Sequence, residues 1–547
     1  RRQTRRRRKR NLLLKMIILI ILIVGTIAAL LLWKKYGPSK ETADLNKYYG
    51  VENDNQLAIV VNNQIIDPKG MITDGKAYVE YSVVRDYINE RFYWDPNENI
   101  LLYTLPKDMV SVEVGSKDYM VSKERKSEKY VIVKTEGNTA YIALDFVQQY
   151  TNIEYEVYDN PSRVMIVSDW GKKKVAEVKK DTQVRYRGGV KSPILSDVSK
   201  DDTVTIIENE GSWEKVRTKD GFIGYVKDSA LRTPETKNVT RKFNEQKFTS
   251  IKKDYKINLA WHNVTNSSAN NGVLEKIAKS KGLTTLAPTW YHVADTEGNI
   301  KSISSTDYVN YAHKANIEVW ATVRDFDGGI NSQKESYELF NTSQFLNDQV
   351  LSYNGNPIDG INVDFEKISK ECGEHYIQFI RELSVRCRQN GLVLSVDNYV
   401  PKGYNMQYNR KEQGIVADYV IIMGYDEHFA GSPEAGSVSS YNYVKEGISE
   451  TLKEVPANKV ISGIPFFTRL WEVRAKTEDE LAQDVGTANE EYTNKVTSKA
   501  LGMDSAQAVV KEAGVKTTWD DETKQNFASW TSGDTTYSIW LEDEKSM

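Results

Sequence analysis

Cysteine and histidine are scarce in this sequence, with two and five copies among 547 residues. Cys372 and Cys387 lie in one segment with a helical pattern, where a rise of about 1.5 Å per residue separates them by roughly 22 Å. That separation excludes a disulfide within the helix. The five histidines are scattered and form no cluster with cysteine, so we expect neither a metal site nor a cofactor.

Long apolar runs are also rare, and the clearest one, Met16–Trp33, contains no charged residue. It can just span a bilayer, and eight of the first ten residues are Arg or Lys. The heavier basic cluster on the N-terminal side predicts a cytoplasmic N-terminus, a single pass through the cell membrane, and extracytoplasmic domains after Tyr36. A cleavable signal peptide is the alternative. An extracytoplasmic protein without a disulfide framework is typical of bacteria.

Acidic residues outnumber basic ones beyond that segment. Residues 1–35 carry eleven basic and no acidic side chains, so the overall net charge of −3 leaves −14 for the remainder. An acidic remainder does not favour binding to nucleic acid or to anionic lipid. The sequence does not set an oligomeric state.

The length predicts several domains. Between residues 50 and 170, Ala77-Tyr78-Val79 and the segments after it are echoed about 63 residues later by Ala140-Tyr141-Ile142, which predicts a duplicated α+β module. This region resembles the N-terminal domain of copper amine oxidases, although no copper ligands accompany it. The predicted parts are a basic tail and transmembrane anchor (1–35), a linker (36–49), the duplicated module (50–170), an SH3-like β-barrel (171–235), a second linker (236–253) and a β/α barrel (254–547).

The SH3-like prediction rests on short alternating strands separated by Gly and Asp turns. Trp213 and the closing strand Gly221–Val226 resemble a bacterial SH3 domain, a common cell-wall-targeting module. A structural spacer without a ligand is an equally weighted alternative.

The last region alternates apolar strand-like runs with helical patterns, which predicts a parallel sheet with crossover helices. Polar or aromatic residues follow each run, as expected for an eightfold β/α barrel whose active site lies at the C-terminal ends of its strands. The seven predicted strands are Ile257–Trp261, Thr285–Trp290, Ile317–Val323, Gly360–Phe365, Leu392–Val396, Tyr419–Met423 and Val460–Ile464.

The fourth of these strands carries the strongest functional signal. Read as a strand, Asn362, Asp364 and Glu366 share one face at about 6.6 Å spacing, while apolar residues alternate with them on the other. Burying such a column of polar side chains costs free energy unless the side chains are hydrogen-bonded, paired with an opposite charge or needed for function. Two acids so close cannot both ionise easily, so one should have the raised pKa that a general acid requires.

These residues resemble the signature of glycoside hydrolase family 18, in which acids at alternate positions end in a glutamate. Asp359, Asp364 and Glu366 match that signature, and Met423-Gly424-Tyr425-Asp426 matches a second family motif. Within the family, Met423–His428 and Gly463–Trp471 are similar to the bacterial spore and cell-wall N-acetylglucosaminidase branch. The resemblance covers about residues 255–547.

The resemblance implies a role for each site residue. Family members are retaining enzymes in which the acetamido oxygen of the substrate is the nucleophile. Glu366 would protonate the leaving oxygen and later activate water, Asp364 would orient the acetamido N–H, and the Tyr425 hydroxyl would hold the acetamido carbonyl. Asp426 would bind sugar hydroxyls or tune Glu366, and Asp359 would be a structural partner.

Two departures from the family pattern stand out. Asn362 occupies a position where most members have Asp, as the cell-wall branch also shows. The chain reaches Met547 without a recognisable eighth strand or the sugar-contacting Trp that it carries in the family. The sequence therefore predicts a barrel that lacks its eighth strand and a chain that is truncated there.

Several residues near the predicted strand ends could contact sugar. We predict aromatic stacking or polar contacts from Trp290, Tyr291, Tyr399, Arg469 and Trp471, although a buried position is the commoner role for any one aromatic residue. His262 and His428 lie at the same face, where packing or hydrogen bonding is expected of them.

The sequence thus predicts a membrane-anchored hydrolase that cleaves β-1,4 bonds of N-acetylglucosamine in peptidoglycan. A chitinase or chitooligosaccharide hydrolase is the alternative with the same chemistry. A non-catalytic glycan-binding scaffold of the cell wall or of sporulation is the alternative of another class, and retention of Glu366 favours catalysis.

Overall fold

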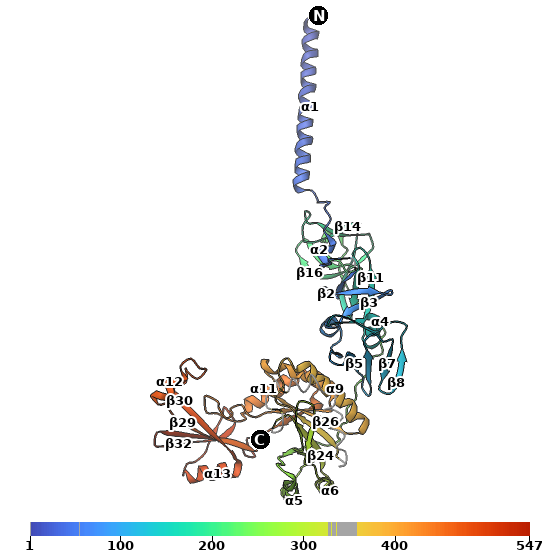
Figure 1. Cartoon of the computed structure of the whole chain (residues 1–547). Helices are drawn as coiled ribbons and strands as arrows, with labels where there is room; N and C mark the ends of the chain where they lie inside the picture. The colour runs from blue at the N-terminus through green and yellow to red at the C-terminus, as the bar shows by residue number, and fades with distance from the viewer. Residues whose placement is uncertain (1, 54, 327–329, 331–334, 336–357) are drawn as a thin grey trace. The chain divides into compact units, whose positions relative to one another are not determined.

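The computed structural model describes residues 2–53, 55–326, 330, 335 and 358–547, and the chain folds as two compact units. The first unit comprises residues 1–103 and 110–245, and the second comprises 104–109 and 246–547. Helix α1 (Arg2–Tyr36) is continuous (Figure 1), and Arg10–Tyr36 within it is long and apolar enough to cross a membrane. A retained anchor and a signal sequence both have this composition.

The first unit begins with two β-sheets. The first sheet has the order β11-β12-β1-β2-β3-β10-β9, with strands β1 (Gln56–Val61), β2 (Gln64–Thr73), β3 (Lys76–Glu80), β9 (Val133–Glu136), β10 (Thr139–Ala143), β11 (Glu154–Tyr158) and β12 (Arg163–Val167). The second runs β4 (Phe92–Asp95), β5 (Ile100–Thr104), β6 (Met109–Glu113), β7 (Asp118–Val121) and β8 (Glu124–Ser127).

The two echoing sequence segments adopt the same local order but do not pack alike. Strand β3 is followed by helical turns (α3, Tyr81–Val83, then Val84–Ile88) and the β4-β5 hairpin, while β10 is followed by α4 (Leu144–Tyr150) and the β11-β12 hairpin. The first hairpin belongs to the five-stranded sheet and the second to the seven-stranded sheet. A duplication of the module therefore stays a prediction.

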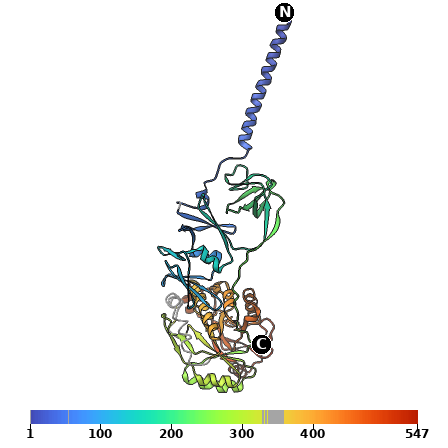
Figure 2. The ribbon, with the colours of Figure 1, turned by 90° about the vertical axis from the view of Figure 1, so that its right-hand side faces the viewer.

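A third sheet completes the first unit. Its order is β15-β14-β18-β17-β16-β13-β19, with strands β13 (Gly171–Glu177), β14 (Thr182–Arg185), β15 (Ile194–Val198), β16 (Thr203–Glu210), β17 (Trp213–Arg217), β18 (Ile223–Lys227) and β19 (Glu235–Val239). A short 3-10 turn, Asp228–Ala230, follows β18. Figure 2 shows this sheet, in green, beside the first sheet, in blue. The short strands agree with the predicted barrel, whose SH3 identity stays a prediction.

The predicted linkers contain ordered structure. Helix α2 (Leu45–Tyr49) lies in the segment predicted as the first linker, and its fully buried Tyr49 donates a hydrogen bond to the Gly221 carbonyl. Strand β19 lies where the second linker was expected to begin, and it pairs with β13. Both segments are polar, but long-range contacts hold them on the barrel, and the domain boundaries stay predictions.

The second unit contains the seven predicted parallel strands. Their order is β20-β21-β24-β25-β26-β27-β28, and each neighbouring pair is parallel. Their bounds are β20 (Leu259–His262), β21 (Thr285–Pro288), β24 (Glu318–Arg324), β25 (Gly360–Asp364), β26 (Val393–Tyr399), β27 (Tyr419–Met423) and β28 (Val460–Gly463). Among the described residues, no eighth parallel strand joins β28 to β20.

Helices surround these strands (Figure 2). They are α5 (Val273–Lys279), α6 (Thr306–Lys314), α9 (Gly373–Asn390), α10 (Arg410–Val416) and α11 (Tyr441–Thr451), with 3-10 turns at Ser267–Gly272, Gly403–Tyr408 and Ala457–Lys459. Most residues of α9 between Tyr376 and Cys387 are buried, and Gly391 ends the helix in the left-handed conformation that glycine adopts without strain. Phe379 of α9 stacks on Phe365, which ties this helix to the end of β25.

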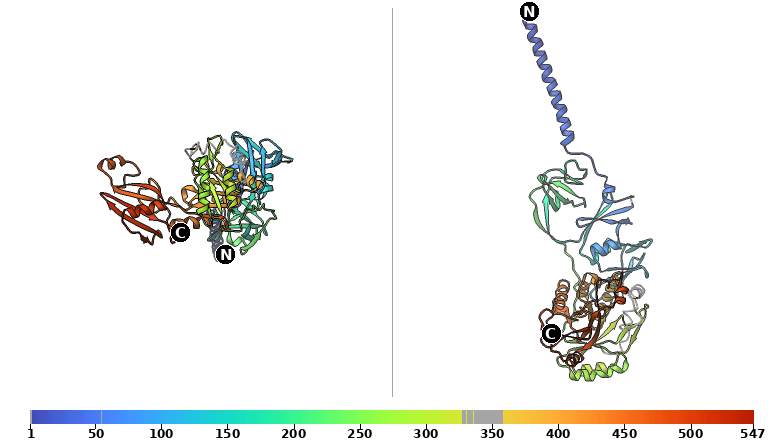
Figure 3. Two further views of the ribbon diagram at one scale, coloured as in Figure 1. Left: turned by 90° about the horizontal axis from the view of Figure 1, so that it is seen from below. Right: turned by 90° about the vertical axis from the view of Figure 1, so that its left-hand side faces the viewer.

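After β28 the chain leaves the parallel sheet and forms an antiparallel one. Its order is β30-β29-β33-β32-β31, with strands β29 (Phe467–Ala475), β30 (Asn494–Gly502), β31 (Thr518–Asp520), β32 (Gln525–Ser532) and β33 (Thr535–Leu541) and helices α12 (Glu478–Asp484) and α13 (Met503–Glu512). Figure 3 shows these strands side by side, in orange to red. Ala506 and Val510 of α13 pack with Ile539 in a small core of their own.

Candidate active site

Strand β25 presents alternate residues to two environments. Ile361, Val363 and Phe365 pack in the main hydrophobic core with α9. Asn362 is fully buried on the opposite face, where its amide nitrogen donates to Ser395 Oγ at 3.1 Å and its amide oxygen accepts from Thr322 Oγ1 at 3.1 Å. The predicted alternation is confirmed, so the polar column lies inside the curved sheet.

Glu366 lies just past the C-terminal end of β25 and is partly exposed. Its backbone N–H donates to Asp325 Oδ1 at 2.9 Å, and the Lys367 N–H donates to Asp325 Oδ2 at 3.1 Å. The Tyr399 hydroxyl, at the end of β26, donates to Glu366 Oε2 at 2.9 Å. Two neighbouring strand ends thus fix both the backbone and the carboxylate of this residue.

The pKa of Glu366 is raised above its ordinary value. Burial is the largest cause, and the nearby carboxylates of Asp325 and Asp426 raise the pKa further. The hydrogen bond from Tyr399 opposes them, because it stabilises the ionised form. A carboxyl group that is partly exposed and keeps its proton to higher pH is suited to donate that proton to a ligand.

Asp364 lies two residues earlier and is more deeply enclosed. Burial raises its pKa well above the ordinary value, and the carboxylates of Asp397, Glu366 and Asp325 raise it further. Its Oδ1 is buried without a hydrogen-bond partner among the described residues. An unpaired buried carboxyl oxygen is costly, so this atom is available to a ligand.

Asp397 of β26 is a buried acid that the sequence analysis missed. Its Oδ1 accepts from the Asn362 amide at 2.8 Å and its Oδ2 accepts from the Trp261 indole N–H at 3.2 Å. Burial raises the pKa of Asp397, although these two hydrogen bonds lower it in part. Asp397, from the adjacent strand, thus lies beside Asn362. In most of the family the position of Asn362 on β25 is itself an aspartate.

Trp261 links three strands of the sheet. Its indole N–H also lies 3.1 Å from Asn362 Oδ1, and its ring meets the Tyr425 ring edge to face at 6.5 Å between centroids. The far edge of the indole lies over Gly463 of β28, where an added Cβ would be 3.0 Å from the ring. Trp261 therefore reaches from β20 across the interior to β28.

Tyr425 and Asp426 follow β27 on the same side as Glu366. Burial raises the pKa of the Tyr425 hydroxyl, and Asp397, Asp364 and Glu366 raise it further, which keeps the hydroxyl a neutral donor. Asp426 adopts a left-handed backbone conformation with φ of 58°, and burial raises its pKa while Arg469 lowers it. The structure brings the second sequence motif next to the first.

Asp359 lies at the opposite end of β25. Its Oδ2 accepts from the Val319 N–H at 2.8 Å and lies 2.8 Å from His313 Nε2. These contacts attach the start of β25 to β24 and α6, in keeping with a structural partner. The two other histidines considered make local contacts: His262 shares a hydrogen bond with Tyr308, and His428 donates to the Ser437 carbonyl.

Three of the residues predicted to contact sugar are buried. Trp290 and Tyr291 are at most 1% exposed, and the Trp290 indole donates to Asn270 and packs against Tyr308 of α6. The prediction fails for this pair because β21 ends at Pro288 and the chain turns into a hairpin, β22 (Tyr291–Val293) with β23 (Ile300–Ser302). Trp471 is also 1% exposed, since its indole donates to the Gly436 carbonyl.

The other two predicted contact residues lie closer to the carboxylates. Tyr399 holds Glu366, as described above, and Arg469 of β29 acts electrostatically on Asp426 and donates to Ser498. Exposed aromatic rings occur at different positions from those predicted. Tyr404, Phe429 and Phe466 are 80%, 54% and 70% exposed, and they follow β26, β27 and β28 respectively.

Asp325, Asp397 and Trp261 share a sequence signal with Glu366. Each lies at the C-terminal end of a predicted strand, where Glu366 was found by the same rule. Their contacts with β25 depend on which strands are neighbours, which the sequence alone does not give.

Within the described part of the chain, no group of three His, Cys, Asp or Glu side chains is arranged to hold a metal ion.

Comparison with known families gives two matches. Residues 261–547 match Glycosyl hydrolases family 18, and residues 60–167 match the copper amine oxidase N-terminal domain. The first match covers more than half of the chain and includes every site residue named above.

Known proteins with similar sequences come from Bacillus. The uncharacterized glycosylase YvbX of Bacillus subtilis (strain 168) is 27% identical over 269 residues, which are 46% of this chain and 72% of that protein. The cortical fragment-lytic enzyme of Bacillus anthracis is 25% identical over 195 residues, 34% of this chain and 41% of that protein. Among solved structures, the spore cortex-lytic enzyme SleL of Bacillus cereus is 19% identical with a TM-score of 0.45, covering 58% of this chain and 70% of that chain.

Proposed function

This chain belongs to family 18 of the glycosyl hydrolases, and from that premise we propose that it hydrolyses β-1,4 bonds following N-acetylglucosamine in bacterial peptidoglycan. The observation that carries the proposal is the end of β25. There a partly exposed Glu366, held by Tyr399 and Asp325, stands two residues from the enclosed Asp364, whose Oδ1 has no partner among the described residues.

In the first step the acetamido oxygen of the bound sugar attacks the anomeric carbon. Glu366 gives its proton to the leaving glycosidic oxygen, so the glycosidic bond breaks while the new carbon–oxygen bond forms. The raised pKa of Glu366 supports this assignment, because the group must be protonated before the reaction. The product of the step is an oxazolinium ion with Glu366 ionised.

In the second step water attacks the same carbon from the face that the leaving group vacated. Ionised Glu366 accepts a proton from this water, the bond to the acetamido oxygen breaks, and the sugar is released with its original anomeric configuration. The two inversions make the overall reaction retaining. Glu366 returns to its protonated form and can act again.

Asp364 and Tyr425 hold the acetamido group in this scheme. Asp364 accepts the acetamido N–H and faces the positive charge of the intermediate, and the Tyr425 hydroxyl donates to the acetamido oxygen. Asp397 raises the pKa of the buried Asp364, which supports one proton shared between the two acids before the reaction. When the cation forms, its charge favours ionised Asp364, and Asp397 keeps the proton.

Two observations favour peptidoglycan over chitin as the substrate. Similar Bacillus proteins include cortical fragment-lytic enzymes. Helix α1 would also hold the enzyme at the outer face of a membrane, where peptidoglycan is the neighbouring polymer. We assign sugar contacts outside the immediate site to the exposed rings of Tyr404, Phe429 and Phe466.

The test compares the full chain, purified in detergent, with its Glu366→Gln variant. Purified peptidoglycan and chitin oligomers are the substrates, and mass spectrometry identifies the product ends. We expect the variant to lose roughly 10²- to 10⁴-fold in rate, as loss of a general acid-base group does, and to retain polymer binding. Glu371→Gln is the matched control, since Glu371 is an exposed glutamate five residues further on.

Each result decides between the alternatives. Products with a reducing N-acetylglucosamine end from peptidoglycan support the proposal, and cleavage of chitin oligomers alone makes the protein a chitinase. A wild-type chain that binds glycan without cutting it is a scaffold. Equal cleavage by Glu366→Gln and the wild type would refute the catalytic assignment.

A further inference from the structure

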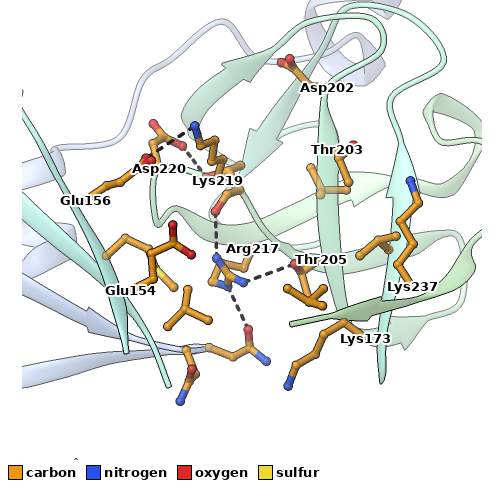
Figure 4. A pocket seen from close by; sticks show the side chains of 18 of the residues that line it. Glu154, Glu156, Lys173, Asp202, Thr203, Thr205, Arg217, Lys219, Asp220 and Lys237 are labelled. Atoms are coloured by element: carbon orange, nitrogen blue, oxygen red, sulfur yellow. Dashed lines mark hydrogen bonds and ion pairs between the residues drawn. The ribbon is translucent and has the colours of Figure 1, made fainter. Parts of the chain in front are cut away.

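The first unit contains a pocket of about 800 Å³ between its two seven-stranded sheets, the one that carries β11 and the one that carries β13 (Figure 4). Side chains of β11 and β12 line one wall, and those of β13, β16 and β19 line the other. The two sheets share a hydrophobic core, so the walls of the pocket belong to one packed body. Its floor includes apolar side chains, among them Met165, Val175 and Val204.

Arg217, at the end of β17, is the polar centre of this pocket (Figure 4). Its guanidinium donates to Asn63 Oδ1 at 3.1 Å, to Thr205 Oγ1 at 3.3 Å and to the Thr218 carbonyl at 3.5 Å. All three acceptors are uncharged, and burial lowers the pKa of Arg217. A partly buried cation with neutral partners is costly unless an anion joins it, and a guanidinium pairs best with a carboxylate.

Strand β11 gives the pocket a second feature. It lies at the end of its sheet and pairs only with β12 in the described part of the chain, so its other edge has free N–H and C=O groups. Three consecutive residues, Glu154, Tyr155 and Glu156, line the pocket, which places the strand's backbone along the wall. A free strand edge beside a cavity can pair with an extended peptide.

Acidic side chains border the same edge. The Glu154 carboxylate is exposed and makes no hydrogen bond or ion pair in the described structure, whereas the Glu156 carboxylate lies 3.6 Å from the Lys219 ammonium. An uncommitted carboxylate at the rim complements an amine on the ligand. The pocket thus offers a guanidinium for a carboxylate, a strand edge for a peptide backbone and a carboxylate for an ammonium group.

We propose that this pocket binds a short extended peptide that ends in a free carboxylate and carries an amine side chain. The terminal carboxylate pairs with Arg217, the backbone adds to the edge of β11, and the amine lies at Glu154. The site is separate from the glycan-cleaving site and does not depend on it. Recognition of a peptide here would give the chain a second contact with a polymer whose glycan strands carry peptides.

Calorimetric titration of the full chain in detergent tests the proposal. The probe is acetyl-Ala-Lys-Ala-Ala with a free C-terminus, compared with the same peptide ending in an amide and with acetyl-Ala-Gln-Ala-Ala. We expect the amide to bind at least about tenfold more weakly, because it loses a charge-assisted hydrogen bond. Acetate alone should bind far more weakly than the peptide, since it cannot pair with β11.

Variants locate the binding. Arg217→Gln should remove the preference for the free carboxylate, and Glu154→Gln should remove the preference for Lys over Gln while leaving the carboxylate preference intact. Arg187→Gln is the matched control, since Arg187 is an exposed arginine in the same barrel and does not line the pocket. Circular dichroism checks the fold of each variant. If Arg217→Gln does not fold, two comparisons still test the proposal: the acid and amide peptides on the wild-type chain, and the Lys and Gln peptides on Glu154→Gln.

Three results would overturn the proposal. Equal affinity for the acid and amide peptides removes the role of Arg217, and equal affinity for acetate and the peptide removes the role of β11. No binding of any probe means that the two glutamates of β11 only keep its edge from pairing with other chains. Cleavage of chitin oligomers should be unchanged in all three variants, so failure here is distinct from failure of the proposed hydrolase activity.

Discussion

The Tyr399 hydroxyl is the one hydrogen-bond donor recorded for the Glu366 carboxylate, within the described structure. We predict that Tyr399→Phe raises the pKa of Glu366, because the lost bond favoured the ionised form. The general acid then stays protonated to higher pH, so the alkaline limb of the kcat/KM profile should move upward in pH. The rate at the optimum should fall roughly tenfold from poorer orientation of the carboxylate.

A pH profile on a chromogenic N-acetylglucosamine oligomer measures both effects. Tyr441→Phe is the control, because Tyr441 is 50% exposed and begins α11. An alkaline limb that stays in place, or moves downward, would show that Tyr399 does not act through Glu366.

Asp397 should make the stability of the second unit depend on pH. Burial raises its pKa from the ordinary 3.8 to about 7, so the folded protein binds this proton more tightly than the unfolded chain does. The free energy of unfolding contributed by this group is therefore greatest below pH 3.8 and declines as pH rises towards 7. We predict that Asp397→Asn makes the decline less steep.

Urea unfolding at a series of pH values, followed by tryptophan fluorescence, measures this slope. Asp307→Asn, at an exposed position in the first turn of α6, should keep the wild-type slope. An Asp397→Asn protein as pH-sensitive as the wild type would mean that Asp397 is ionised throughout.

The sequence predicted the column of β25 because alternation is a local property. Polar and apolar residues alternate along one strand, and two side chains two residues apart share a face in any strand. The contacts of Asp325 and Asp397 could not be predicted in the same way, because they depend on which strands become neighbours. Trp290 was assigned wrongly because an extra hairpin turns its ring into the core.

At the scale of the elements, the start of β25 is tightly packed against its neighbours. A Cβ on Gly360 would lie 2.8 Å from the Val393 carbonyl oxygen and 2.9 Å from the Trp320 ring. We predict that Gly360→Ala destabilises the second unit by about 1–3 kcal/mol, the usual cost of overpacking, and lowers activity by moving Glu366. Thermal unfolding and cleavage of chitin oligomers measure the two effects.

Gly403→Ala is the comparison for this variant, because an added Cβ there meets no atom within 4 Å. Its melting temperature and activity should match those of the wild type. If Gly360→Ala is as stable and active as Gly403→Ala, the strands must separate more easily than their packing indicates.

The elements of the second unit were more predictable than those of the first. Seven strand-like runs of five to seven residues, rich in apolar side chains and separated by helical patterns, marked the parallel strands. The borders of the first unit were less predictable. Helix α2 and strand β19 have polar sequences, and contacts such as Tyr49 with Gly221, 172 residues apart, hold them in place.

For the whole molecule, we propose that α1 sets where the enzyme acts. We predict that the full chain sediments with membranes and resists carbonate extraction, because Arg10–Tyr36 is apolar enough to span them. Two arginines placed at Ile20 and Val24 should release the protein, since each costs about 2.5–3.5 kcal/mol near the centre of a bilayer.

Ile20→Leu is the matched control and should stay in the membrane fraction. Mass spectrometry of the N-terminus distinguishes a retained membrane anchor from a cleaved signal sequence. A soluble chain that begins after Tyr36 would identify α1 as a signal sequence and contradict anchoring.

The indole of Trp261 connects β20 and β28, the two outer strands of the parallel sheet, with the buried acid Asp397. Its ring rests on Gly463, while its N–H reaches Asn362 and Asp397. A methyl group added at Gly463 would displace the ring and withdraw a donor from a buried carboxylate more than 60 positions away in the chain. A change in β28 would therefore alter the proton affinity of an acid at the centre of the fold.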